Sequence, residues 1–265
     1  MTRIMSRYAS LAVLAVTGLL SACGGKEWTI PDLSGPIETS RIRFFNFGVN
    51  APSVNFYADN TKMTAVTSTT GTEATSGVAY GGVGSGGAYA SIAPGQHALT
   101  GKIAAATDKD VAISTVTADI ADGKYYSYYM SGFYNTTTKS VEGFVVEDNF
   151  PIPTDITTAT VRFVNAISNA NPMTLYVKNA TTAETAIGSE VAYKSAGAFV
   201  TIPAGVYDIS TRYTGVTTNA LSRTGVNFVG GKVYTITARG DITVAPTTTG
   251  CAAANKTCLD NTANR

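Results

Sequence analysis

The side chains with the chemistry for catalysis or metal binding are few and scattered in this chain. His97 is the only histidine, which excludes a zinc site built from several histidines and leaves a Ser-His-Asp triad to be built on His97 alone. Asp108 and Asp110 flank Lys109 in a predicted turn, whereas a calcium ion needs roughly six to eight oxygen ligands. We therefore predict a solvated turn there, and we expect no metal site, no cofactor and no catalytic residue in the chain.

A glycine-rich segment matches the spacing of a dinucleotide-binding fingerprint. Residues 82–87 read Gly-Val-Gly-Ser-Gly-Gly, which satisfies G-x-G-x-x-G. That fingerprint binds a pyrophosphate only when a strand precedes it and a helix follows, because the N-terminus of the helix faces the phosphates. Residues 88–92 have the pattern of a strand instead, so we interpret the segment as a flexible loop between strands.

The densest aromatic run, residues 125–134, is the main candidate for ligand contact. Its sequence is Tyr-Tyr-Ser-Tyr-Tyr-Met-Ser-Gly-Phe-Tyr, and on a strand these side chains alternate between two faces. Outward tyrosines could stack on sugar rings or anchor a protein partner, and we assign Tyr126 and Tyr128 as candidate binding residues. Ordinary pairing between neighbouring strands is the alternative, and it is the favoured one.

These candidates lie within a sequence that is duplicated. Residues 41–59 recur as residues 160–178, so that Arg43 corresponds to Arg162 and Asn46 to Asn165. The separation between matching positions falls from 119 (162 − 43) to 108 (232 − 124), because loops shorten while the strand-like blocks survive. Two copies of a module need the same fold but need not bind the same ligand. We therefore predict structural roles for the two arginines and Asx turns for the two asparagines.

Apolar residues follow a period near two in short runs punctuated by Gly, Pro, Asn and Asp, which is typical of strands. About seven strands per copy predict an all-β protein of two tandem immunoglobulin-like β-sandwich domains. We place the modules at residues 41–148 and 159–245, with a stiff linker at 149–158. The predicted strands are 41–47, 53–58, 87–92, 96–103, 111–120, 124–134 and 140–147, then 160–166, 173–178, 190–194, 197–202, 206–213, 220–228 and 232–239.

The first 22 residues have the features of a secretory signal. Arg3 and Arg7 precede an apolar run that is too short to span a bilayer. Residues 20–23, Leu-Ser-Ala-Cys, resemble the lipobox of bacterial lipoproteins, which implies cleavage before Cys23 and acylation, including palmitate, at that residue. Ordinary cleavage and an uncleaved anchor are the alternatives. Gly24 follows Cys23, and by resemblance to the lipoprotein sorting rule this implies the outer membrane. Residues 23–40 form a lipidated tether.

Two further cysteines lie near the end of the chain. Cys251 and Cys258 are predicted to form a disulfide in an exported protein. They lie in residues 246–265, which we predict to be a disordered tail outside the second module. Lysine and arginine are scattered singly and the net charge is +1, so the chain lacks the basic footprint of a nucleic-acid binder.

Several of these segments together resemble a known family. The runs Arg-Ile-Arg-Phe-Phe-Asn (41–46) and Ile-Ala-Pro-Gly (92–95) resemble the bacterial cell-envelope modules of the 4397 family of domains of unknown function. The resemblance implies β-sandwiches at the envelope, often as tandem copies in lipoproteins. It carries no activity and no functional residue.

We expect a non-enzymatic interaction or structural module, held at the membrane by its N-terminal lipid, with an envelope protein or a glycan as partner. The rival hypothesis is an envelope hydrolase such as a glycosidase. It would need two carboxylates about 5 to 9.5 Å apart in a cleft.

Overall fold

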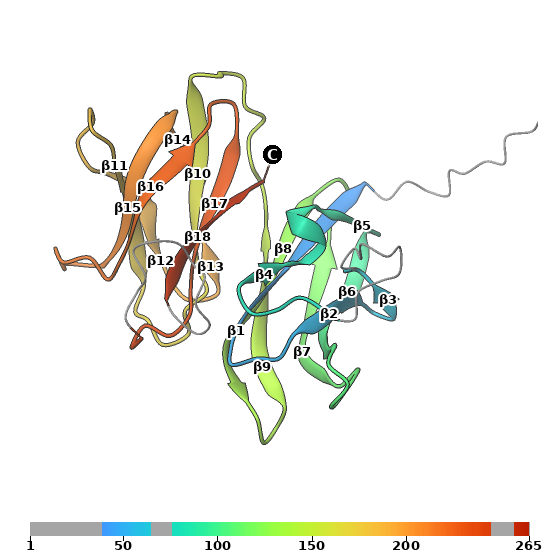
Figure 1. Cartoon of the computed structure of the whole chain (residues 1–265). Coiled ribbons are helices and arrows are strands. Elements are labelled where there is room, and N and C mark those ends of the chain that lie inside the picture. Colours follow the sequence, from blue (N-terminus) through green and yellow to red (C-terminus); the bar gives the residue numbers. More distant parts are fainter. Residues whose placement is uncertain (1–38, 65–75, 245–256, 265) are drawn as a thin grey trace, which may run out of the picture. The chain divides into compact units, whose positions relative to one another are not determined.

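The structure is a computed structural model that describes residues 39–64, 76–244 and 257–264. In these residues the chain is almost entirely strands, arranged as two sandwich-like units (Figure 1). The sole helical element of the described part is η2 (Gly84–Gly87). No helix in that part is long and apolar enough to cross a membrane.

The first module consists of two sheets. One has the order β4-β1-β8-β9, with β5 also pairing with β1, and the other has the order β3-β2-β6-β7. Strands β1 and β8 run parallel with Arg43 opposite Ser127, whereas the other pairs are antiparallel. The strands are β1 (Ser40–Val49), β2 (Val54–Ala58), β3 (Thr61–Lys62), β4 (Gly82–Val83), β5 (Ala90–Ile92), β6 (Gly95–Ile103), β7 (Ala112–Ile120), β8 (Tyr125–Asn135) and β9 (Ser140–Glu147).

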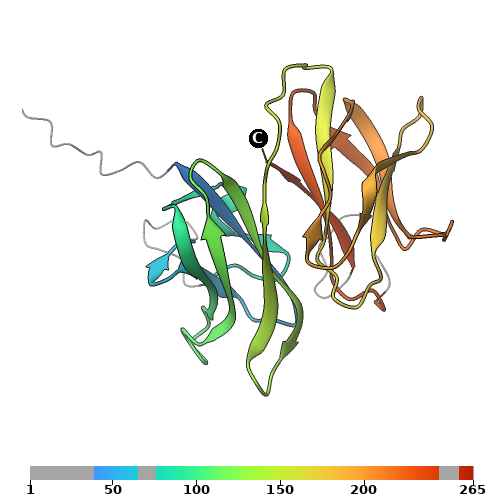
Figure 2. The ribbon, with the colours of Figure 1, turned by 180° about the vertical axis from the view of Figure 1, so that it is seen from behind.

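The second module, drawn in yellow to red in Figure 2, repeats this topology strand for strand. Its sheets have the orders β13-β10-β17-β18, with β14 pairing with β10, and β12-β11-β15-β16. Strands β10 and β17 are parallel, with Arg162 opposite Thr235. The strands are β10 (Thr158–Asn165), β11 (Met173–Lys178), β12 (Thr185–Val191), β13 (Ser195–Ala196), β14 (Val200–Pro203), β15 (Gly205–Tyr213), β16 (Leu221–Phe228), β17 (Val233–Arg239) and β18 (Cys258–Ala263).

The last strand corrects the prediction of a disordered tail. Residues 258–263 form β18, which pairs antiparallel with β17 and places Ala263 opposite Tyr234. In the first module β9 pairs with β8 in the same way and places Glu147 opposite Tyr126. This strand was not predicted from the sequence for two reasons. A long stretch of chain separates it from β17, and the polar residues Asp260, Asn261 and Thr262 are not typical of a strand. The second sandwich is therefore complete only with the end of the chain.

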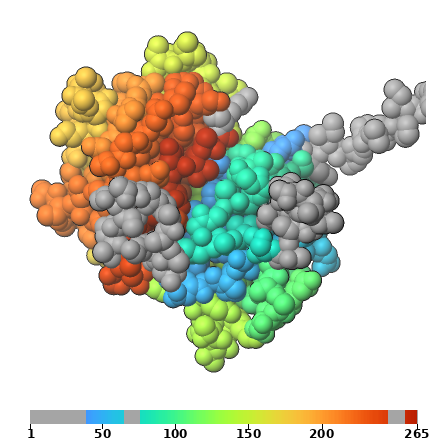
Figure 3. All heavy atoms as spheres, in the orientation of Figure 1, coloured from blue at the N-terminus to red at the C-terminus, as the bar shows by residue number. Residues whose placement is uncertain are grey.

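Each module encloses its own apolar core. Ile42 and Phe44 of β1 pack with Val54, Phe56 and other residues in the first module, and the second module has a matching cluster around Val161, Phe163 and Leu175. Neighbouring residues in space come from distant parts of the sequence. Val54 forms a bridge with Val78, and the blue and teal segments near these positions lie side by side on the surface (Figure 3).

A third apolar cluster joins the two modules within the compact unit formed by residues 38–265. It contains residues from both copies, namely Phe45, Phe47, Tyr129, Phe144, Val164 and Ala166. The sheets that carry β1 and β10 are thus covered on both faces, which explains why nearly every residue of these strands is buried. Strands buried on both faces are apolar almost continuously instead of alternating, as in the run Phe-Phe-Asn-Phe of residues 44–47.

Candidate functional site

The repeated arginines lie on the faces that the two modules turn toward this shared cluster. Arg43 of β1 and Arg162 of β10 are only 1% and 2% exposed. Their Nε atoms donate to the hydroxyls of their register partners, at 3.2 Å to Ser127 and 3.1 Å to Thr235. Each arginine side chain therefore lies on the face opposite its inward-facing neighbours, as alternation predicts, and is held to the adjacent parallel strand.

Each arginine also bonds to the edge strand of the other module. Arg43 Nη1 donates to the carbonyl of Ala263 in β18, and Arg162 Nη1 donates to the carbonyl of Glu147 in β9, both at 2.9 Å. The two acceptors occupy equivalent ends of equivalent strands, so the interface has approximate two-fold symmetry. An aromatic ring lies against each cation, Tyr89 at 4.6 Å from Arg43 and Phe199 at 4.7 Å from Arg162.

The residues that follow the edge strands break this symmetry. Asp148, after β9, accepts from Ser127 at 2.6 Å and forms a buried ion pair with Arg162. Asn264, after β18, accepts from Thr235 at 2.8 Å. An uncharged amide thus stands where the other copy has a carboxylate, and Nη2 of Arg43 has no hydrogen-bond partner among the described residues.

Tyr89 links the two unequal halves of this cluster. Its hydroxyl donates to Asp148 at 2.6 Å and accepts from the amide of Asn264 at 3.1 Å. Burial raises the pKa of Tyr89, and the negative charge of Asp148 raises it further, against the opposing effect of Arg43. The ring therefore remains a neutral donor between a carboxylate and a cation.

A second equivalent pair of contacts lies farther along β8 and β17. Arg239 of β17 is 2% exposed, forms an ion pair with Asp260 and lies over the ring of Tyr80 at 4.9 Å. The corresponding positions are Ser131 and Tyr193, whose hydroxyls are 3.0 Å apart. The polar contacts of the interface thus follow the repeat even where the residue types differ.

At these second contacts, burial is the main cause of the pKa shifts of Asp260 and Tyr193. Burial raises the pKa of Asp260 against the opposing charge of Arg239. It also raises the pKa of Tyr193, whose hydroxyl donates to Glu142 at 2.7 Å. That hydrogen bond is the largest cause of the lowered pKa of Glu142.

Asn46 and Asn165 make the same local hydrogen bonds in both modules. Their Oδ1 atoms accept from the backbone two residues ahead, Gly48 N at 3.3 Å and Ile167 N at 3.1 Å. Their Nδ2 atoms donate to the carbonyls of Val78 and Val191, respectively. These are the predicted Asx turns, with a further bond that holds the neighbouring connection to the strand end.

Tyr126 and Tyr128 are buried in the first core, which corrects their assignment as binding residues. Tyr126 is 7% exposed and its hydroxyl accepts from Ala121 N at 3.0 Å. Tyr128 is fully buried, and its hydroxyl bonds to Ser114 at 2.7 Å. The opposite face of β8 is covered by the other module, so Tyr129 is buried as well. The strand pairs as the favoured interpretation predicts, and these rings cannot stack on a ligand.

The remaining sequence candidates have local contacts. His97 lies between Asp59 Oδ2 at 2.8 Å and the carbonyl of Ala93 at 2.9 Å. Its counterpart Tyr207 donates to the equivalent carbonyl, that of Pro203, at 2.8 Å. Both side chains thus bond to the carbonyl four residues earlier.

Asp108 forms an ion pair with Lys139. Within the described ranges, no group of three or more His, Cys, Asp or Glu side chains could hold a metal ion.

The glycine-rich segment does not form a dinucleotide site. Residues 82–83 are β4, and η2 comprises only four residues with Ser85 and Gly86 in left-handed conformations, at φ 52° and 65°. Strand β5 follows at Ala90. The segment is therefore a strand–turn–strand connection, and no helix N-terminus faces a phosphate position.

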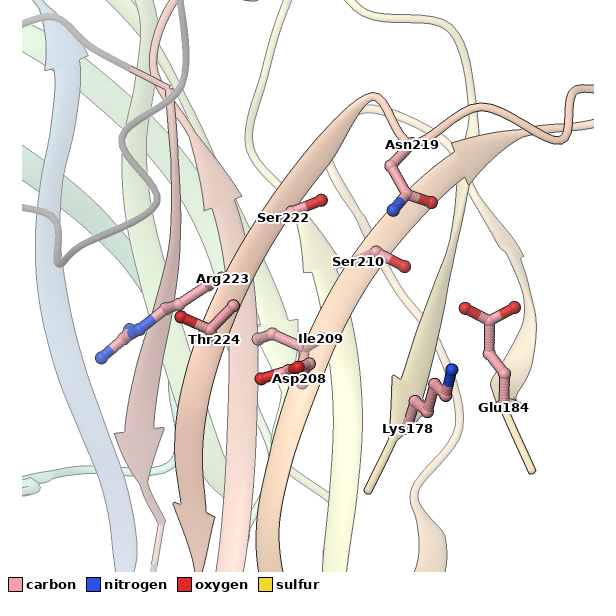
Figure 4. Close-up of a pocket in the computed structure, with 9 residues that line it drawn as sticks. All are labelled: Lys178, Glu184, Asp208, Ile209, Ser210, Asn219, Ser222, Arg223 and Thr224. Carbon is pink, nitrogen blue, oxygen red and sulfur yellow. The ribbon is translucent and has the colours of Figure 1, made fainter. Parts of the chain in front are cut away.

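Sequence reasoning missed a polar hollow of about 310 Å³ on the outer face of sheet β12-β11-β15-β16 (Figure 4). Lys178 and Glu184 lie at one side of it and Arg223 at the other, with the hydroxyls of Ser210 and Ser222 between them. These residues lie on four separate segments, so no spacing in the sequence connects them.

The carboxylates of this hollow are already engaged. Both oxygens of Glu184 accept from Arg212 at 2.7 Å, and Arg212 lies over the ring of Tyr176 at 4.6 Å. Asp208 accepts from Gly225 N at 3.1 Å. The hollow therefore presents hydroxyls, the ammonium of Lys178 and carboxylates that already accept hydrogen bonds.

The cysteines are only partly within the described residues. Cys258 lies buried in β18, whereas Cys251 and Cys23 lie outside the described residues. The disulfide and the lipidation therefore stay predictions. The signal and most of the tether, residues 1–38, also lie outside.

The chain belongs to the family described as "Domain of unknown function (DUF4397)". Its family model matches residues 40–158 and 159–260, which confirms the tandem arrangement. The second match reaches into β18, in agreement with the strand's place in the module. No protein with curated annotation matches the chain.

Solved structures show only distant likeness. The Bacillus anthracis TIE protein is 13% identical with a TM-score of 0.24, covering 76% of this chain and 33% of its own. A leucine-rich repeat protein from Bacteroides thetaiotaomicron is 11% identical with a TM-score of 0.20, covering 80% and 26%. The chain thus spans about a third and about a quarter of these two proteins, and neither superposition carries an argument about function.

Proposed function

We propose that this chain is an envelope lipoprotein anchored through Cys23, in which two β-sandwich modules act as one non-enzymatic interaction or structural unit. One observation carries the second half of this proposal. Arg43 and Arg162, a charged pair that the repeat preserves, are buried and bond across the interface between modules. Their shared role supports a structural function, because the arginines join the two modules and the outer faces of the sheets remain available to a partner.

The outer hollow supports binding over hydrolysis. A glycosidase needs one carboxylic acid and one free carboxylate flanking the bond to be broken. In the hollow, Arg212 holds both oxygens of Glu184. The partner class we propose is an envelope protein or a glycan, to be identified by proximity labelling in living cells.

The anchor is tested by Cys23→Ala in the full-length chain, with Cys251→Ala as the matched control for loss of a cysteine. The unaltered chain and Cys251→Ala should incorporate labelled palmitate and partition into the detergent phase. Cys23→Ala should do neither, because the acylated residue is the proposed anchor. Firm membrane association of Cys23→Ala without label would overturn the lipoprotein proposal.

A further inference from the structure

One end of the second module carries aliphatic side chains that are largely exposed. Ile156 of the connection between modules is 84% exposed, and Val206 and Val229 are 58% and 49% exposed. Ile152, four residues before Ile156, is 72% exposed. Single exposed aliphatic residues are common on protein surfaces, whereas several gathered at one end mark a surface that meets an apolar partner.

Backbone contacts bring Ile156, Val206 and Val229 together, and Ile152 precedes them in the connection between modules. Gly230, next to Val229, lies so close to the carbonyl of Ile156 that an added Cβ would collide with it. Ala204 N donates to the carbonyl of Thr157 at 2.8 Å, which places the start of β15, and with it Val206, at the same end. We call Ile152, Ile156, Val206 and Val229 the aliphatic end.

The aliphatic end lies where the chain enters the folded unit from its N-terminal segment. Strand β1 begins at Ser40, and Arg41 lies opposite Tyr125. The ring of Tyr125 is 5.2 Å from that of Phe150, two residues before Ile152. Because Phe150 also lies 6.3 Å from Phe199 of the second module, this single ring joins the entry point to the start of the aliphatic end.

A second route leads to the same conclusion. Arg43, three residues into β1, bonds to Ala263. The next residue, Asn264, donates to the carbonyl of Val233 at the start of β17, directly after Gly230, Gly231 and Lys232. The aliphatic end and the first described strand residue are thus at one end of the 38–265 unit.

We propose that the aliphatic end contacts the surface of the lipid bilayer to which the chain is anchored. This inference rests on the proposed anchor at Cys23. From Cys23 to Ser40 the tether has 17 residues (40 − 23), at most about 56 Å when fully extended. A tether of that reach keeps the entry end near the membrane at high effective concentration, so that weak insertion of a few aliphatic side chains suffices.

A neighbouring lysine fits this partner. Lys232, which precedes β17, is exposed beside the aliphatic end and its ammonium can reach lipid phosphates while its stem lies on apolar groups. Asp155 of the same connection is exposed, and its carboxylate accepts from Thr157 N at 2.8 Å and Thr157 Oγ1 at 2.7 Å, so local donors engage part of its charge.

The test uses the chain from residue 23 onward with Cys23→Ser, held on vesicles by an N-terminal histidine tag and a nickel-chelating lipid. Attachment then does not depend on acylation, so a failure of the lipoprotein proposal and a failure of this inference give different results. Trp28, the single tryptophan of the sequence, is replaced by Phe. In this background the fluorescence of Ile156→Trp reports on the aliphatic end. Val216→Trp is the matched control, because Val216 is 42% exposed beyond the opposite end of β15.

In vesicles of phospholipid with brominated acyl chains, Ile156→Trp should lose roughly half or more of its fluorescence and shift to shorter wavelength, because the indole enters the acyl boundary. Val216→Trp should be unaffected. Equal quenching of both, or of neither, would overturn the inference. A wavelength shift of Ile156→Trp that grows with protein concentration but not with brominated lipid would assign the surface to a second copy instead, and would likewise overturn it.

Discussion

Arg43, four residues into the described structure, donates a hydrogen bond to the carbonyl of Ala263, two residues before the end of the chain. Its equivalent, Arg162, bonds to Glu147 and to the buried carboxylate of Asp148. The duplicated arginines therefore have the same geometry but unequal electrostatic surroundings, and this difference can be measured.

Arg162→Ala should lower the free energy of unfolding by about 3 to 5 kcal/mol, because it leaves the carboxylate of Asp148 buried without its cation. Arg43→Ala should cost less, about 1 to 3 kcal/mol, since its lost partners are a carbonyl and a hydroxyl. Chemical denaturation of the full chain measures both. Lys139→Ala removes an exposed pair with Asp108 and serves as the control, with an expected change under about 1 kcal/mol. Equal costs for Arg43 and Arg162 would contradict the assigned asymmetry.

Removal of residues 257–265 should destabilise both modules. The deletion strips the partner strand from β17 and also removes the acceptor of Arg43. Amide hydrogen exchange should accelerate along β17 and also at β1, because protection depends on paired strands and on burial. Substitution of Thr107 by Ala, at an exposed turn away from β1, is a control for local perturbation. Unchanged exchange at β1 in the truncated chain would show that the bond to Ala263 contributes nothing to the first module.

The two modules should unfold together in the intact chain. Separation would expose the shared cluster of Phe45, Phe47, Tyr129, Phe144, Val164 and Ala166, which favours a single cooperative transition. A fragment of residues 39–149 contains every strand of the first module, but its uncovered face should bind a hydrophobic dye or self-associate. A monomeric fragment that binds no dye would indicate that the modules are independent.

Stability should fall in alkaline solution. Burial raises the pKa of Tyr89, Tyr128, Tyr129 and Tyr193 above the ordinary value of 10. The unfolded chain releases these protons near pH 10, whereas the folded chain retains them. Their contribution is therefore fully present below about pH 10 and is lost as the pH rises above it. Tyrosinate absorbance should appear together with loss of β-structure. Ionisation of all 14 tyrosines while the fold persists would contradict the burial.

Much of the fold follows from the sequence alone because short-range alternation and turn residues are local signals. The duplication and most strands are visible in this way, and the equivalence of Asn46 and Asn165 extends to individual hydrogen bonds. Strand β18 could not be predicted by these means, since its pairing with β17 depends on a partner far away along the chain. Its polar residues are accommodated because Asp260 meets Arg239.

The interface between the two modules could not be predicted from the sequence for a different reason. Alternation places Tyr126 and Tyr128 on one face of β8 and Tyr129 on the other, but it does not say what covers each face. The run Phe44-Phe45 followed by Phe47 contained the missing information, because apolar residues at adjacent positions require burial on both sides of a sheet. The polar hollow around Ser210 and Ser222 left no such signal.

The bond between Arg43 and Ala263 spans 220 residues of sequence, and this has a consequence for biogenesis. In a chain that is made from its N-terminus, the strands of the first module are complete before Val164 and Ala166, which cover Phe45 and Phe47, and long before Ala263, the acceptor of Arg43. Closing so long a loop is slow compared with local strand pairing. A chaperone that shields this face until β10 and β18 are available would therefore favour correct folding, and depletion of such a factor should harm the full chain more than its second half.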